Sequence, residues 1–166
     1  MQLSEIEREQ LYAIVEKYDH HPDVQRMREY IQHGSVTTYQ HCKNVALVSF
    51  WLNRRLHLHA DETSLAVGAL LHDFYLYDWY EQKSPHSVHV AIHPALALKN
   101  ASERFELTPV EADIIRNHMW PLTPDRYPHS IEAFLVTLTD KTSAAGETFL
   151  PGGKRATRNA LDRTGR

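Results

Sequence analysis

Six histidine and aspartate residues lie at positions where the helical pattern of the chain calls for apolar side chains. They are His41, His72, Asp73, His93, His118 and Asp140. His41 continues an apolar stripe through Val45 and Leu52 at helical spacing. Asp140 likewise follows Val136 by one helical turn. Imidazole and carboxylate together suit iron, manganese, zinc, nickel or cobalt, so the pattern predicts a centre for one or two divalent transition-metal ions.

A single histidine on an apolar face is usually a hydrogen-bonded core residue, but six such residues on separate segments are hard to explain in that way. A buried, unpaired carboxylate is costly, whereas cations and imidazoles around it offset the cost. The single cysteine, Cys42, leaves no set of thiolates for a structural zinc site, which favours a catalytic metal. Successive side chains on a helix differ by about 100°. His72 and Asp73 can therefore flank one ion, or Asp73 can bridge two.

Other residues near these positions are candidates for catalysis. Lys141, directly after Asp140, could donate to a phosphate oxygen. Asp78 follows the His72-Asp73 pair and could transfer protons, or it could orient a ligand imidazole. Asp73, Asp78 and Lys141 are therefore the predicted catalytic residues.

Aromatic and histidine residues near the same positions are candidates for substrate binding. Trp79 and Trp120 could form the wall of a nucleobase pocket, although core packing or a homodimer surface explains such aromatic residues equally well. His89, one turn before His93, could be an alternate ligand or a phosphate donor. The remaining histidines, in polar or loop settings, are expected to be exposed: His20, His21, His33, His57, His59, His86 and His129.

The spacing of apolar residues predicts helices throughout the chain and hence an all-α fold. The predicted helices cover about 4–18, 22–31, 38–57, 62–77, 93–105, a segment beginning at Pro109, and 131–148. Thr108 and Glu111 form the clearest start signal, a capping box with proline in the first turn. The helix over 62–77 is apolar nearly all round, which predicts the central, buried position.

Length and charge limit the broad class of protein. A chain of 166 residues fits one domain, predicted over 1–150, followed by a flexible tail at 151–166 with five basic residues and one acidic residue. The net charge is −3, so the body is acidic, which argues against a nucleic-acid partner. With one cysteine, no signal peptide and no membrane-spanning stretch, we expect a soluble, cytoplasmic protein.

The ordered series His41, His72-Asp73 and Asp140, the last within Leu138-Thr139-Asp140-Lys141, resembles the HD-domain metal-dependent phosphohydrolase superfamily over about 37–146. The resemblance implies a compact bundle of six to eight helices. It also implies that His41, His72, Asp73 and Asp140 hold a first ion. In the two-metal members, two further histidines hold a second ion, here His93 and His118 with Asp73 as the bridge.

The activity implied by this resemblance is hydrolysis of a phosphate ester or anhydride of a small molecule by metal-activated water, with a nucleotide as the expected substrate. Phe74-Tyr75 replaces the Ile-Gly that follows the dipeptide in cyclic-di-GMP phosphodiesterases, and no GYP motif follows, so that substrate is not favoured. The series is more similar to small stand-alone bacterial enzymes, including two-metal dinucleoside-tetraphosphate hydrolases. Two alternatives stay open: a di-iron oxygenase of the same fold, and a non-catalytic metal- or nucleotide-binding regulatory module.

Overall fold

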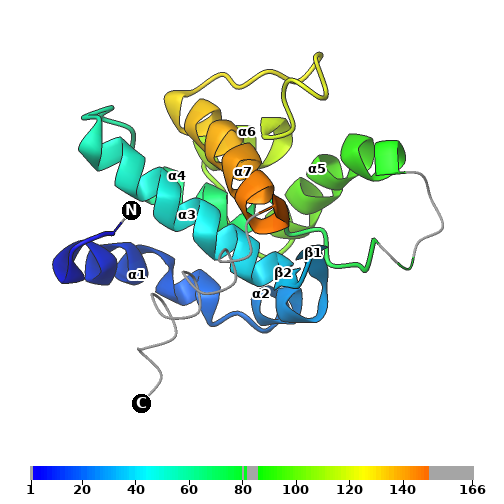
Figure 1. The fold of residues 1–166 in the computed structure, drawn as a ribbon, viewed down its shortest axis with the longest axis horizontal. Coiled ribbons are helices and arrows are strands. Elements are labelled where there is room, and N and C mark those ends of the chain that lie inside the picture. Colours follow the sequence, from blue (N-terminus) through cyan, green and yellow to red (C-terminus); the bar gives the residue numbers. More distant parts are fainter. Residues whose placement is uncertain (1, 80, 82–85, 150–166) are drawn as a thin grey trace.

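The computed structural model describes residues 2–79, 81 and 86–149 (Figure 1). Its helices are α1 (Glu5–Asp19), α2 (Pro22–Arg26), α3 (Thr38–Arg55), α4 (Glu62–Leu71), α5 (His86–Ser102), α6 (Pro109–Asn117) and α7 (Ile131–Phe149). A 3-10 turn η1 (Met27–Glu29) and a short antiparallel pair, β1 (Ile31–His33) and β2 (Val36–Thr37), follow α2. The predicted all-α fold is confirmed. The predicted basic tail at 151–166 lies outside the described residues.

Helix α4 occupies the centre of the bundle, as its apolar sequence predicts. Every residue from Ser64 to Leu71 is buried. The helix packs against α1, α3, α6 and α7, and α7 also packs across α3 and α6 (Figure 1). The elements that carry the six candidate ligands are therefore either α4 itself or close neighbours of it, apart from α5, which packs against α6.

Side-chain caps fix where the central helices begin. Thr108 accepts a hydrogen bond from the backbone N–H of Glu111, whose carboxylate accepts one from the N–H of Thr108, so the predicted capping box is present. Thr37 caps α3 in the same reciprocal way with Gln40. Asp61 caps α4 through the backbone N–H of Ser64. These caps set the register of helices that carry candidate ligands.

The prediction of one helix over 62–77 was wrong at its C-terminal end, because α4 stops at Leu71. The chain turns there, and the backbone N–H of Phe74 bonds to the carbonyl of Leu71. The amide of Asn100 on α5 donates to the carbonyls of Phe74 and Tyr75, which replaces the helical partners those groups lack. His72 therefore caps the helix, and Asp73 lies just beyond it.

Two further helix boundaries differ from the predictions. The predicted helix over 22–31 ends at Arg26 and gives way to η1 and β1, and Gly34 makes the turn to β2 with a φ of 59°. Helix α5 begins at His86 rather than near His93, so Pro94 lies inside the helix instead of in its first turn. Proline lacks the N–H needed for the i→i−4 bond, which is why it resembled a start signal. The predicted break at 84–85 lies outside the described residues.

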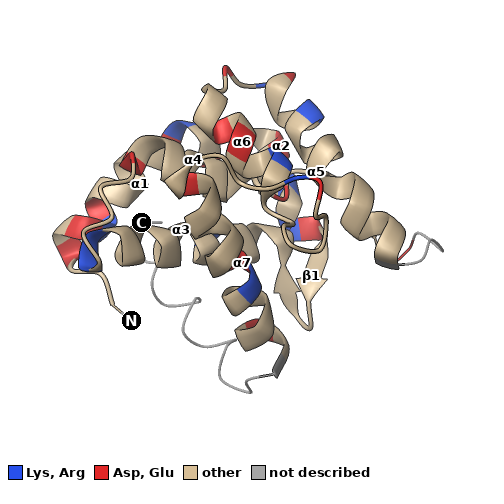
Figure 2. Cartoon of the chain, turned by 90° about the horizontal axis from the view of Figure 1, so that it is seen from above, with Lys and Arg blue, Asp and Glu red and all other residues tan. Residues whose placement is uncertain are grey.

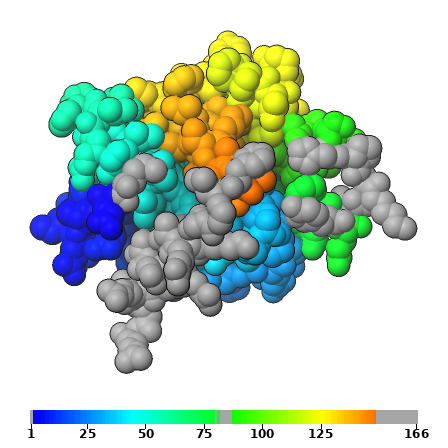
Figure 3. Space-filling view, in the orientation of Figure 1, coloured from blue at the N-terminus to red at the C-terminus, as the bar shows by residue number. Residues whose placement is uncertain are grey.

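Acidic and basic residues are interspersed along the helices (Figure 2). Helix α7 is visible on one face of the molecule, between parts of α3 and α5 (Figure 3). Phe134 and Leu138 on this helix are about half-exposed. In the described part of the chain, no helix has both the length and the apolar character needed to cross a membrane.

Candidate metal centre

The structure brings all six candidate ligands together in one buried cluster. His41, His93 and Asp140 lie within α3, α5 and α7, and His72 and His118 cap the C-terminal ends of α4 and α6. None of the six is more than 7% exposed. Residues up to a hundred positions apart along the sequence thus form one site.

Asp73 lies in the middle of this cluster, and its two carboxylate oxygens face different histidines. Oδ2 is 3.3 Å from Nε2 of His72 and 3.9 Å from Nε2 of His41. Oδ1 is 3.2 Å from Nε2 of His93 and 3.4 Å from Nε2 of His118. The carboxylate therefore has the arrangement that a bridge between two cations requires.

Asp140 completes the first of these two halves. Its Oδ1 is 3.0 Å from Nε2 of His41 and 3.8 Å from Nε2 of His72. In each of three buried groups, one donor atom per residue lies within 4.8 Å of the others. The groups are His41, His72 and Asp73; His72, His118 and Asp140; and Asp73, His93 and His118.

Backbone carbonyls orient three of the imidazoles towards the centre. Nδ1 of His72 lies 2.7 Å from the carbonyl of Ala69, and Nδ1 of His118 lies 2.9 Å from that of Ile115. Nδ1 of His93 is held in the same way, 2.9 Å from the carbonyl of His89. A carbonyl can only accept, so each Nδ1 carries the proton, and in the neutral ring each Nε2 presents a lone pair to the cluster.

The donor set fits divalent cations. Nε2 of His72 and Oδ1 of Asp73 are buried and make no hydrogen bond within the described part of the chain. Nε2 of His93 and Nε2 of His118 face each other at 2.9 Å, so two neutral rings would oppose their lone pairs there. Buried polar atoms are normally satisfied, and a cation would satisfy all of these at once.

Charge in the cluster is balanced by coupling between carboxylates and imidazoles. Burial lowers the pKa of His41, but the hydrogen bonds that its ring makes to the carboxylates of Asp140 and Glu147 outweigh it and raise the pKa to about 10. Burial raises the pKa of Asp73, but the charge of His72 together with hydrogen bonds from His118, His72 and His93 outweighs it and holds the pKa well below the usual range. Without a metal, the carboxylates thus favour protonated imidazoles, and the protons supply positive charge. Bound cations would supply this charge instead.

His118 behaves differently from His41. Burial lowers its pKa to about 4, because the nearby carboxylate of Asp73 compensates only in part. The imidazole is therefore neutral at physiological pH, which is the protonation state of a metal ligand.

A second layer of polar residues, which sequence reasoning missed, holds the cluster in place. Oε2 of Glu147 is 2.8 Å from Nδ1 of His41, and its Oε1 accepts from Nδ2 of Asn44 at 2.7 Å. Gln32 on β1 donates from Nε2 to Oδ2 of Asp73 at 2.7 Å. Its own Oε1 accepts from the hydroxyl of Tyr75. The only sequence signal for any of these was Glu147, two helical turns after Asp140 on α7.

The expectation that His33 is exposed was wrong. Its ring packs against His41 with centroids 5.2 Å apart, and it forms a further potential ligand group with His41 and Glu147. Burial lowers the pKa of His33. The hairpin of β1 and β2, which the helical pattern did not predict, is what brings it there.

Lys141 lies at the edge of the cluster. Its Nζ donates to the backbone carbonyl of His118 at 2.8 Å and to Oδ2 of Asp140 at 3.3 Å. The side chain is 30% exposed. The ammonium is thus beside a candidate ligand and also reachable from solvent.

His89 and Trp79 form a stack that ends on a candidate ligand. The ring of His89 lies 4.6 Å from His93 and 5.0 Å from Trp79, nearly parallel to both. The hydroxyl of Tyr77 is 2.6 Å from Nδ1 of His89. His89 belongs to none of the ligand groups found among the described residues, and the roles of His89 and Trp79 in ligand or substrate binding stay predictions.

The remaining predicted site residues lie away from these contacts. Trp120 packs against Phe134, with ring centroids 6.4 Å apart, on the half-exposed face of α7. Asp78 lies in the segment between α4 and α5, where its Oδ1 accepts from the backbone N–H of Glu81 at 3.3 Å. Roles for Trp120 in substrate binding and for Asp78 in catalysis stay predictions.

Comparison with known proteins gives one match. The family model described as HD domain matches residues 38–145, which include all six residues of the cluster. No significant match was found among curated proteins or among solved structures.

Proposed function

Because the chain belongs to the HD domain family, whose members are commonly metal-dependent hydrolases, we propose that it hydrolyses a phosphate ester or anhydride of a small molecule, with nucleotides as the preferred class. The observation that carries this proposal is the position of Asp73, with one oxygen towards His41 and His72 and the other towards His93 and His118. In the proposal, His41, His72, Asp73 and Asp140 hold one ion, and Asp73, His93 and His118 hold a second.

Divalent ions bound there would lower the pKa of a coordinated water and neutralise phosphate charge. The residues of the chain supply the fixed positions of the ligands and the contact with the phosphate. Oriented Nε2 atoms hold the ligand geometry without reorganisation, and Gln32 fixes the rotation of the Asp73 carboxylate. Lys141, next to Asp140 and partly exposed, is placed to turn its ammonium towards a phosphate oxygen.

The test combines metal analysis with a substrate panel. Elemental analysis of the purified protein identifies the metal, and release of phosphate from nucleotides is then measured with that metal and with manganese. In Asp73→Asn the amide nitrogen cannot coordinate, so we expect less metal per chain and loss of nearly all turnover. Asp125→Asn changes an exposed carboxylate, 76% accessible, and is the matched control.

Other outcomes would replace the proposal. Oxygen consumption with a mixed-valent iron signal and no phosphate release would indicate the oxygenase chemistry of some proteins with this fold. Retained metal and nucleotide binding without turnover would indicate a regulatory module. The cytoplasmic location stays a prediction, which fractionation would check. Light scattering would show whether the chain forms the homodimer that the sequence left as one explanation of its aromatic residues.

A further inference from the structure

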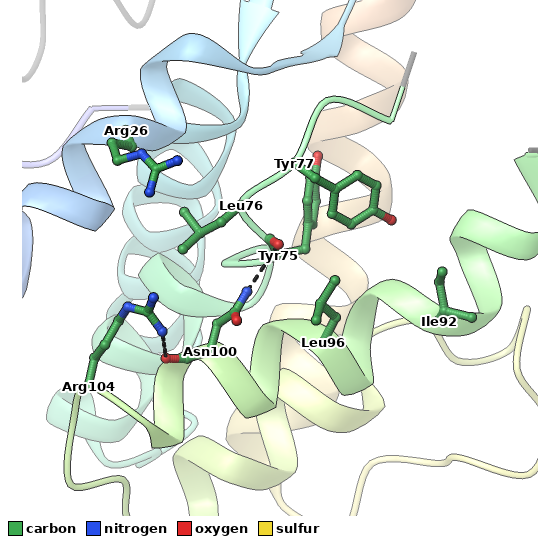
Figure 4. Close-up of a pocket in the computed structure, with 8 residues that line it drawn as sticks. All are labelled: Arg26, Tyr75, Leu76, Tyr77, Ile92, Leu96, Asn100 and Arg104. Carbon is green, nitrogen blue, oxygen red and sulfur yellow. Dashed lines mark hydrogen bonds between the residues drawn. The ribbon is translucent and has the colours of Figure 1, made fainter. Parts of the chain in front are cut away.

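An open cleft of about 400 Å³ lies outside the metal centre, between α2, the segment after α4, and α5. It is lined by Arg26, Tyr75, Leu76, Tyr77, Ile92, Leu96, Asn100 and Arg104 (Figure 4). The volume is in the range of pockets that hold small organic ligands. The proposed hydrolysis assigns no role to Arg26, Asn100 or Arg104, which line this cleft.

One end of the cleft carries positive charge that the chain does not fully neutralise. The guanidinium groups of Arg26 and Arg104 lie at this end (Figure 4), and both bind Asp23, at 3.2 and 2.6 Å. Glu103 also approaches Arg104 at 3.4 Å, but it is shared with Lys99 at 3.9 Å. In this set of ion pairs Arg26, Arg104 and Lys99 share two carboxylates, and Lys99 lies outside the cleft.

Asp23 holds both guanidinium groups in place. Arg104 uses Nε for Asp23 and Nη1 for the carbonyl of Asn100 at 2.9 Å. Its Nη2 makes no hydrogen bond to the described residues. A guanidinium that is already held in place and has one nitrogen without a protein partner can donate to an oxyanion with little loss of side-chain entropy.

The walls of the cleft are apolar. Leu76, Leu96 and Ile92 line it together with the aromatic rings of Tyr75 and Tyr77 (Figure 4). Ile92 is 45% exposed, which is apolar surface that a ligand could cover. Leu76 has a φ of 59°, a conformation that bulky residues rarely adopt.

We propose that this cleft binds a small amphipathic oxyanion, with its carboxylate or phosphate head at Arg26 and Arg104 and its apolar chain along Leu76, Leu96 and Ile92. The site is separate from the metal centre. The ring of Tyr75 stands between them, packed against His93 with centroids 5.8 Å apart. Its hydroxyl bonds to Gln32, which in turn holds Asp73, so an occupant of the cleft touches the network that orients this carboxylate.

Isothermal titration of the purified, metal-containing protein tests the proposal. Hexanoate and hexyl phosphate are the probes, and the two heads distinguish a carboxylate from a phosphate ligand. Hexanol tests the alkyl chain without an anionic head, and inorganic phosphate tests the anionic head without the alkyl chain. We expect one saturable site for at least one of the two probes and at least tenfold weaker binding of both controls.

Variants locate the site. Arg26→Met, at a half-exposed side chain, and Ile92→Glu, at the exposed wall, should each weaken binding at least tenfold without disturbing the core. Arg116→Met removes an exposed arginine that lines a different, smaller basic pocket with Lys99 and Arg126, and should leave binding unchanged.

Three results would overturn the proposal. The first is that neither probe binds in a saturable way. The second is that Arg116→Met weakens binding while Arg26→Met does not, which would move the anion to the other pocket. The third is that a chelator abolishes binding of hexanoate, which would place it at the metal centre. None of these depends on phosphate release, so the outcome is independent of the proposed hydrolysis.

Discussion

Asp73 shows how much of the centre depends on the orientation of a single side chain. Its carboxylate touches four imidazoles and one amide, and a quarter-turn about its terminal torsion would move both oxygens away from these partners. Gln32 prevents this by donating to Oδ2, and Gln32 is itself held by Thr38 and Tyr75. A ligand that must face two ions is thus fixed by a chain of buried hydrogen bonds.

Glu147 supplies a testable case of such support. Its carboxylate faces Nδ1 of His41, so it orients the ring and makes Nε2 a stronger electron-pair donor to a metal ion. We expect Glu147→Gln to weaken binding of manganese by about 10- to 100-fold, as measured by competition with a chromophoric chelator. Unchanged affinity would contradict the role. Glu9→Gln, at an exposed position on α1, is the control.

Among single residues, the sequence revealed polar residues that stand where the helical pattern calls for apolar ones. It did not reveal polar residues that stand in a polar stretch. A histidine or aspartate on an apolar stripe, such as His41 or Asp140, is conspicuous in the sequence. Gln32 and Asn44 are unremarkable in a polar stretch, and only the tertiary fold buries them. The roles of the six candidate ligands in metal binding stay predictions, although the structure brings them together.

Among the elements, the packing of α4 against α6 sets the distance between two candidate ligands. A methyl group on Gly68 would lie 2.4 to 3.0 Å from three side-chain atoms of Ile114, which is itself fully buried. His72 lies four residues after Gly68, and His118 lies four residues after Ile114. The glycine therefore permits the close approach that brings these two imidazoles together.

Gly68→Ala should consequently force α4 and α6 apart. We expect a loss of about 1 to 3 kcal/mol in the free energy of unfolding, measured with urea, together with weaker metal binding. Gly146→Ala is the matched control, because a methyl group there meets nothing within 4 Å. That variant should be neutral or up to about 1 kcal/mol more stable, since alanine favours a helix. Equal effects of the two substitutions would refute the packing argument.

Asp113 joins α6 to the start of α7 across a long loop. Its carboxylate accepts from Nδ2 of Asn117 at 2.7 Å, from Oγ of Ser130 at 2.8 Å and from the backbone N–H of His129 at 3.0 Å. Burial raises the pKa of Asp113, but hydrogen bonds from His129, Asn117 and Ser130 outweigh it, so the pKa lies below the ordinary value of 3.8. The ionised form is therefore favoured by folding.

The sign of the pH dependence follows from this lowered pKa. The contribution of Asp113 to stability is complete above the unfolded pKa of 3.8 and is lost as pH falls through the lower folded pKa. We expect Asp113→Asn to lose about 1 to 2 kcal/mol at neutral pH, and the difference from wild type to shrink below pH 3.8. Urea midpoints over a pH series measure it. A difference that stays constant through the acid range would show that the charge plays no part.

Helix boundaries show where prediction from local pattern fails. The cap of α6 is short-range chemistry and was predicted from Thr108, and the caps of α3 at Thr37 and of α4 at Asp61 are of the same local kind. The end of α4 at Leu71 depends on Asn100, nearly thirty residues away, which satisfies the carbonyls that leave the helix. Apolar periodicity carries no information on such a distant partner, so the predicted helix ran on past the His72-Asp73 pair.

For the molecule as a whole, the six candidate ligands converge from five helices or helix ends. Two carboxylates, Asp73 and Asp140, are buried there among the four imidazoles. Ions bound in the cluster would link elements across the bundle, and they would bind the folded chain only, because the unfolded chain does not assemble the site. Metal binding should therefore stabilise the entire fold.

We accordingly expect the melting temperature to rise with the concentration of manganese. A ligand at about 100 times its Kd adds about 2.7 kcal/mol, which corresponds to roughly 5 to 10 °C for a chain of this size. Differential scanning fluorimetry of protein stripped with a chelator, and of the same protein after manganese is restored, measures the shift. Calcium, which prefers oxygen ligands, should give a smaller shift at a centre with four imidazoles. If His118→Ala, which removes one of these imidazoles, kept the full manganese shift, the cluster would not be where the metal binds.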